Sequence, residues 1–254
     1  MAEINAQIQL LQTELTVHQE KLAEYAYPVL SLPNEIVSDF FVQCLPTYPD
    51  CPPLRGPSSP TSLTHICRKW RDIALATPQL WRSILLQAVG NDATLRARLA
   101  RSGSCPLSIK MQSDQHDSPL HPDIFAAILP HHKRWEYVDL TLEDDEVALL
   151  EGIMPLLCEL ILHVPAGFDL DSTRPSANAR DFPRLRTLSL NCSDDLGDWL
   201  PWSQLTSLTL KNLHSDNYLS TLSSAVNLLH VTSIDCMQYS QDRVKDVTLP
   251  RLEI

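Results

Sequence analysis

The 254-residue chain contains only six glycines, and they are scattered. Phosphate-binding loops need several glycines within a few residues, so that the backbone can approach the phosphates closely. No such loop occurs, and a Gly-x-Ser-x-Gly nucleophile elbow is also absent. We therefore expect no catalytic residues and no cofactor, and a protein that is not an enzyme.

Paired cysteines and a recognisable secretory signal are lacking as well. None of the cysteines forms a Cys-x-x-Cys pair; they stand at positions 44, 51, 67, 105, 158, 192 and 236. An odd number of scattered thiols favours a reducing compartment, cytoplasmic or nuclear. Cys44, Cys51, His65 and Cys67 can be grouped as zinc ligands. However, His65 and Cys67 lie two residues apart on a predicted helix and would point away from each other, so we expect no metal site.

Basic residues are in the minority, and long apolar runs are missing. Lys and Arg number 20 against 31 Asp and Glu, a net charge of −11. A nucleic-acid surface needs clustered positive charge, and a membrane span needs about 20 consecutive apolar residues. We therefore expect neither a nucleic-acid nor a membrane partner. The apolar content of 44% is that of a globular protein.

Residues 28–85 predict a unit of three short helices. Pro33 suits the first turn of a helix, and apolar residues follow it at helical spacing: Ile36, Val37, Phe40 and Phe41. A second helix is predicted from Leu63 to Ala74, and Pro78 ends it before Leu80 and Trp81. So small a unit buries too little of its surface alone. It should present an apolar face to a partner.

The motif Leu-Pro-x-Glu-Ile-Val…Phe…Ile-Cys-x-x-Trp-Arg-x-Ile-Ala…Pro-x-Leu-Trp resembles the F-box, in the form of the large fungal F-box-like family. That resemblance implies docking to the Skp linker subunit of an SCF-type cullin–RING ubiquitin ligase. Carried over by position, the linker-facing residues are Leu32, Pro33, Ile36, Val37, Phe40, Leu63, Ile66, Cys67 and Trp70. The unit's own core is expected from Ile73, Ala74, Leu80 and Trp81. A departure from the family is the long loop from Cys44 to Pro60, rich in Pro, Ser and Thr.

Residues 1–27 are predicted to be mainly one helix, over residues 3–26, with a coiled-coil seam. The seam positions are Ile4, Ile8, Leu11, Leu15, His18, Leu22 and Tyr25. Two alternatives stay open. The helix either pairs with a second copy to form a homodimer, or folds onto the helical unit beside Tyr27 to Leu30.

Residues 90–254 carry a degenerate repeat of the form Leu-x-x-Leu-x-Leu. Its copies begin at Trp135, Leu157, Leu185, Leu205, Leu228 and Leu249, with spacings of 22, 28, 20, 23 and 21 residues. This period is typical of leucine-rich repeats, about 20–29 residues. Leu107-x-Ile109 is a further partial copy, and helices are expected at Asp92–Arg101 and Asp123–His131. The predicted fold is thus an α+β or α/β solenoid of parallel strands, with an ordinary βα sheet domain as the alternative. Because the last copy ends at Ile254 with no closing unit, we hypothesise an incomplete product of a longer gene.

In such an array, alternate strand positions face outward and form one extended surface. Those we expect to contact a target protein are Tyr137, Asp139, Glu159, His163, Ser189, Asn191, Thr209, Lys211 and His230. The remaining outward positions are Thr141, Ile161, Thr187, Ser207 and Thr232. The sequence therefore predicts a substrate receptor that docks the linker through the F-box and a target, whose identity is unknown, through the array. The alternative is a self-associating, non-enzymatic repeat scaffold outside any ligase.

Overall fold

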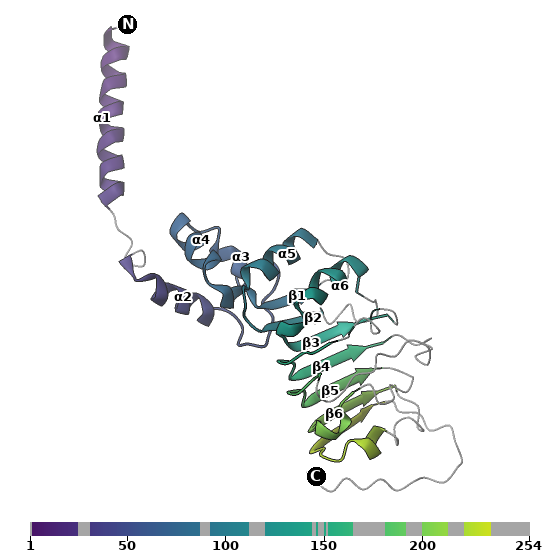
Figure 1. The fold of residues 1–254 in the computed structure, drawn as a ribbon. Helices are drawn as coiled ribbons and strands as arrows, with labels where there is room; N and C mark the ends of the chain where they lie inside the picture. The colour runs from purple at the N-terminus through teal and green to yellow at the C-terminus, as the bar shows by residue number, and fades with distance from the viewer. Residues whose placement is uncertain are drawn as a thin grey trace.

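The structure, a computed structural model, places helices first and a parallel sheet after them (Figure 1). It describes residues 2–24, 31–86, 92–111, 120–143, 146, 150, 152–164, 181–191, 200–212 and 221–234. Mixed α/β architecture is confirmed. In this part of the chain no helix is both long enough and apolar enough to cross a membrane.

Four short helices form what we call the helical head. They are α2 (Asn34–Gln43), α3 (Pro60–Leu63), α4 (Arg68–Leu75) and the 3-10 helix η2 (Pro78–Trp81). Their shared core consists of Val37, Phe41, Ile73, Ala74, Leu80 and Trp81. The indole Nε1 of Trp81 donates a 2.9 Å hydrogen bond to the carbonyl of Ala74, so its polar atom is satisfied inside this core. The core role predicted for the last four of these residues is confirmed.

The prediction of one helix from Leu63 to Ala74 is wrong, because residues 64–67 interrupt it: α3 ends at Leu63 and α4 begins at Arg68. Cys67 has an extended backbone (φ −154°) and its Sγ accepts from the N–H of Trp70, which makes it the residue that caps α4. His65 and Cys67 therefore do not share a helix, and that argument against zinc fails. Among the described residues, no group of three or more His, Cys, Asp or Glu could hold a metal.

Within the described residues, seven parallel strands follow one another in one sheet, each paired with its neighbour in the chain. They are β1 (Ser83–Leu86), β2 (Leu107–Met111), β3 (Trp135–Thr141), β4 (Glu159–His163), β5 (Thr187–Asn191), β6 (Ser207–Lys211) and β7 (His230–Ile234). The register keeps equivalent repeat positions side by side: Leu160 pairs with Leu188, and Leu188 with Leu208. Strand β1 was not predicted, because Ser83 to Leu85 belong to the range 28–85 that was expected to be helical. The last predicted copy, Leu249 to Ile254, lies outside the described residues.

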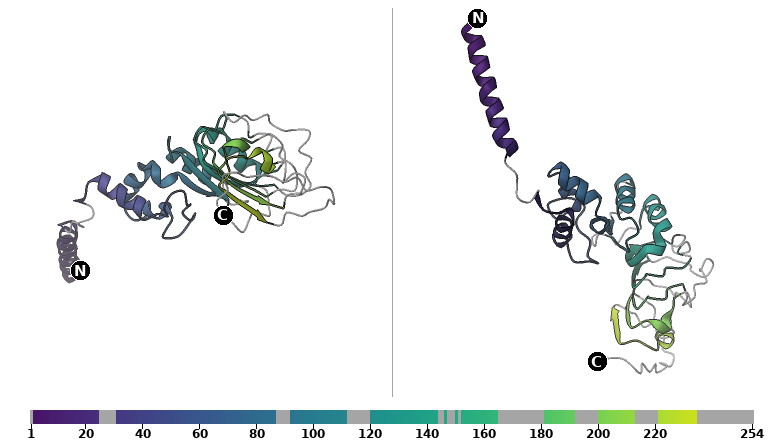
Figure 2. Two further views of the ribbon diagram at one scale, coloured as in Figure 1. Left: turned by 90° about the horizontal axis from the view of Figure 1, so that it is seen from below. Right: turned by 60° about the vertical axis from the view of Figure 1, so that its left-hand side comes forward.

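Helices pack against one face of the sheet, and the buried residues of the helices and of this face form one large core (Figure 2). Strands β4, β5 and β6 alternate between half-exposed and buried positions, as the repeat predicts. Helices α5 (Asp92–Arg101) and α6 (Pro122–Ile128) add Leu95, Leu99, Phe125 and Ile128 to the buried side. The 3-10 helices η4 (Leu129–Arg134) and η7 (Trp202–Gln204) lead into β3 and β6. The opposite sheet face is left for other contacts.

The N-terminal helix α1 (Ala2–Glu24) stands clear of the head and the sheet in all three views (Figures 1 and 2). Its side chains from Glu3 to Lys21 are all exposed. The predicted helix is confirmed over Ala2–Glu24. The exposed side chains do not favour the alternative in which it folds onto the helical unit, but Tyr27 to Leu30, beside which it was expected, lie outside the described residues.

Candidate functional site

The helical head exposes large apolar side chains although its own core is closed. The exposed fraction is 42% for Leu32, 53% for Ile36, 59% for Phe40 and 58% for Ile66. Ile36 and Phe40 are four residues apart on α2, which places them on the same side of that helix. Pro33 precedes α2 with a φ of −55°, close to the helical value, and it adds no N–H of its own at the helix start. These four exposed residues are called the apolar face below.

Other predicted linker-facing residues have different environments. Val37 is only 2% exposed, so its predicted partner-facing role is wrong: it packs into the core of the head. Leu63 and Trp70 are half-buried against that core, with Trp70 meeting Phe41 edge to face at a centroid distance of 4.9 Å. Cys67 is half-exposed and caps α4. Of the predicted set, the residues most open to a partner are therefore the apolar face and Pro33.

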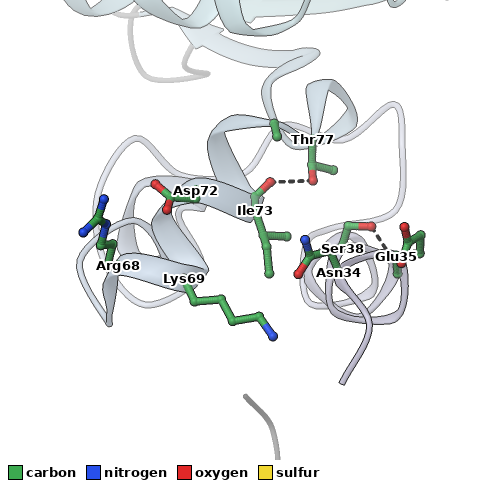
Figure 3. A pocket seen from close by; sticks show the side chains of 9 residues that line it. Asn34, Glu35, Ser38, Arg68, Lys69, Asp72, Ile73 and Thr77 are labelled. Carbon is green, nitrogen blue, oxygen red and sulfur yellow. Dashed lines mark hydrogen bonds between the residues drawn. The ribbon is translucent and has the colours of Figure 1, made fainter. Parts of the chain in front are cut away.

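A shallow, open groove of about 750 Å³ lies in the head between α2 and α4 (Figure 3). It is lined by Asn34, Glu35, Ser38, Arg68, Lys69, Asp72, Ile73, Ala76 and Thr77. The ammonium of Lys69 donates to the carbonyl of Leu32 at 3.2 Å and so ties α4 to the residues that precede α2. Sequence reasoning missed this groove because it followed only apolar positions. Charges of both signs beside an apolar patch suit a protein contact with a polar rim.

The second candidate surface is the sheet face opposite the helices, formed by the outward side chains of β3 to β7 and called the open face below. Among the residues predicted to contact a target, Glu159, Ser189, Thr209 and Lys211 are half-exposed there, and His230 is exposed on β7. Hydroxyl, amide and charged groups dominate these positions. Such groups hydrogen-bond with peptides and protein side chains.

Four polar side chains form a chain across the open face. Asp139 Oδ1 lies 3.7 Å from His163 Nε2, and His163 Nδ1 lies 3.3 Å from Asn191 Nδ2. The amide of Asn212 then donates to Asn191 Oδ1 at 2.7 Å. Asn212 was not predicted. It directly follows an outward strand position and has a φ of +58°, a conformation that asparagine adopts more readily than most residues. An asparagine directly after the last outward residue of a predicted strand is the sequence signal that could have identified it.

The long loop of residues 44–59 packs on the first strands of the sheet. The Tyr48 hydroxyl donates to Glu136 Oε2 at 2.6 Å, and the Arg82 guanidinium lies 3.8 Å from the centre of the Tyr48 ring. The Tyr48 ring also contacts Tyr137 edge to face at 5.5 Å. The pKa of the Tyr48 hydroxyl is raised, mainly by burial and to a smaller extent by the hydrogen bond to Glu136. Tyr137, predicted to contact a target, therefore already supports this loop.

Two further contacts hold the loop to β2. Ser108 Oγ donates to the Pro49 carbonyl at 2.6 Å, and Lys110 Nζ lies 3.3 Å from Asp50 Oδ1. Cys51 lies beside Ser108 at 3.8 Å, and burial raises the pKa of its thiol. A raised pKa keeps the thiol protonated, so Cys51 is suited to packing and not to nucleophilic chemistry.

The outward position Thr141 departs from its predicted exposure. It is 0% exposed, at the end of β3, and its N–H donates to the sulfur of Met111. The usable part of the open face is therefore carried mainly by β4 to β6, where outward positions stay half-exposed.

Comparisons with known proteins assign no family. No protein-family model matches the chain, and no curated protein matches it. The apolar face of the head and the open face of the sheet are thus the two surfaces that point to a function.

Proposed function

We propose that this chain is an F-box substrate receptor of an SCF-type cullin–RING ubiquitin ligase. The observation that carries the proposal is the apolar face. Ile36, Phe40 and Ile66 are each more than half exposed on a unit whose own core is already closed. Large exposed apolar side chains that a unit does not need for its own core indicate a protein-binding site. A Skp-type linker would cover them, with Leu32 and Pro33 at the edge of the contact.

The sheet supports the second half of the proposal. Strands that follow in chain order, with leucines at their inward positions, are typical of leucine-rich-repeat arrays. Extended open faces of such arrays bind proteins. The target would contact β4 to β6, with Glu159, His163, Asn191 and Lys211 as its hydrogen-bonding and charged partners.

The proposed receptor has no catalytic step of its own. Partner subunits perform ubiquitin transfer, and the receptor holds a target lysine near the charged conjugating enzyme. Tethering raises the effective concentration of that lysine, which accelerates transfer without new chemistry.

The test is binding of the full chain to a purified Skp-type linker, with Ile36→Asp as the disrupting variant. A buried aspartate in an apolar contact should weaken the complex by roughly 30-fold or more. Ile153→Asp is the matched control, because Ile153 is 55% exposed on the sheet part of the chain, against 53% for Ile36. Equal binding by the two variants would place the contact elsewhere.

Absence of linker binding by the wild-type chain would overturn the proposal. In that case the alternative, a non-enzymatic repeat scaffold outside any ligase, would be favoured.

A further inference from the structure

Helix α1 presents apolar side chains to solvent along its length. Exposed fractions are 58% for Ile4, 47% for Ile8, 60% for Leu11 and 59% for Leu15. These residues are spaced by four, three and four positions, which aligns them along one stripe of a helix. Most of the stability of a helix in a protein comes from packing of its apolar side. We therefore expect a partner to cover the stripe.

We propose that a second copy of this chain covers it, so that two α1 helices form a short coiled coil. The spacing is that of a seam in which each apolar side chain fits between those of an identical partner helix. The chain's own head does not supply the cover, since the described side chains of α1 are all exposed. This inference is independent of linker binding by the head.

The flanking positions of the seam are compatible with self-pairing. On one side they are Asn5, Gln12 and Gln19, all uncharged, and on the other they are Gln7, Glu14 and Lys21. Two copies therefore bring no like charges together along the seam. Charged flanking residues of opposite sign set the orientation of a coiled coil.

Glu14 and Lys21 favour the antiparallel arrangement. With Leu15 of one helix opposite His18 of the other, Glu14 of each copy lies against Lys21 of its partner. A parallel pair would place Glu14 against the uncharged Gln19, and would bring the two His18 side chains together in the seam. The antiparallel pair also sets the remaining parts of the two acidic chains at opposite ends of the coiled coil.

The seam is tested by sedimentation equilibrium of the full chain, up to about 100 µM. The disrupting variant is Leu11→Gln with Leu15→Gln, and the matched control is Leu10→Gln with Val17→Gln. Leu10 and Leu11 are 61% and 60% exposed on the same helix, but Leu10 and Val17 lie away from the stripe. Glutamine is uncharged, like the residues it replaces, so the net charge of the helix does not change. It also has a high helix propensity.

We expect a dimer for the wild-type chain and the control, and a dissociation constant at least about 100-fold weaker for the seam variant. Helicity measured by circular dichroism should fall on dilution only in the chains that dimerise. A wild-type monomer throughout the range, or equal effects of the two double variants, would overturn the proposal.

The orientation is tested by charge. In the antiparallel dimer, Lys21→Glu replaces both Glu14–Lys21 pairs with pairs of carboxylates. Their repulsion should weaken the dimer roughly tenfold at low salt. Adding Glu14→Lys to that variant restores opposite pairs and should restore the affinity. If Lys21→Glu leaves the dissociation constant unchanged, the antiparallel arrangement is wrong.

Discussion

Adjacent residues of similar chemistry have opposite roles in the head. Phe40 is 59% exposed, whereas Phe41 is 0% exposed and packs against Trp70. Ile36 and Val37 differ in the same way. Helical periodicity identifies the apolar side of α2, but it cannot say which of two neighbouring apolar residues faces inward when both lie near the edge of that side. The position of α4 decides this, and it is set by tertiary packing.

Alanine substitution should separate the two phenylalanines. Phe41→Ala removes a fully buried ring, and should lower the free energy of unfolding by about 3–5 kcal/mol. Phe40→Ala should change it by less than about 0.5 kcal/mol, because little of its area is buried in this chain. Urea denaturation followed by circular dichroism measures both. Comparable losses for the two variants would mean that Phe40 is also covered.

Among the elements, strands were the most predictable and short helices the least. The apolar inward residues of the repeat predicted β3 to β7, and in β4 to β6 each strand buries one side and half-exposes the other. Strand β1 was missed because Ser83 to Leu86 has no full copy of the repeat and follows directly on η2. The break between α3 and α4 was missed because Leu63, Ile66, Cys67 and Trp70 keep helical spacing across it. Cys67 is also an unusual residue at a helix start.

Replacing the sulfur cap of α4 should stabilise the protein. Cys67 Sγ accepts from the Trp70 N–H at 3.4 Å, and sulfur is a weak acceptor. In Cys67→Ser a hydroxyl, a preferred cap, should raise the free energy of unfolding by about 0.5–1 kcal/mol. Cys44→Ser is the control, since Cys44 is exposed at the C-terminal end of α2, and should have no measurable effect. A loss of stability in Cys67→Ser would fit the uninterrupted helix instead.

In the whole molecule, the head and the sheet are joined by more than the chain connection at β1. The loop of residues 44–59 contacts β2 and β3, and the Arg101 guanidinium of α5 lies 4.8 Å from the ring centre of Trp81 in the head. A loop rich in Pro, Ser and Thr predicts a linker from composition alone. Its docking depends on Tyr48, Ser108 and Glu136, which are distant in sequence and have no shared motif. No pattern in the sequence could have brought them together.

Loop docking is measurable in Tyr48→Phe, which keeps the ring but removes the hydrogen bond to Glu136. We expect a loss of about 1–2 kcal/mol in the free energy of unfolding. Asp50→Asn removes only an ion pair whose carboxylate is 72% exposed, and should cost less than about 0.5 kcal/mol.

Alkylation of Cys51 gives a second measurement of the same docking. Burial raises its thiol pKa, so it should react slowly with iodoacetamide in the wild-type chain. The reaction should be faster in Tyr48→Phe, as measured by mass spectrometry of the labelled peptide. Unchanged labelling together with unchanged stability would show that Tyr48 does not hold the loop in place.

The loop of residues 44–59 packs on β2 and β3, toward one end of the sheet, so the two ends of the sheet differ in how freely strands can be added or lost. Duplication or loss of one strand-and-connection unit beyond β3 would lengthen or shorten the array while leaving Ser108, Glu136 and Tyr137 in place beneath the loop. Loss of a unit between β1 and β3 would remove the surface on which the loop rests, and a duplication there would displace part of it. Variation in repeat number among descendants of such a gene should therefore accumulate toward β7, and the geometry next to the head should stay constant.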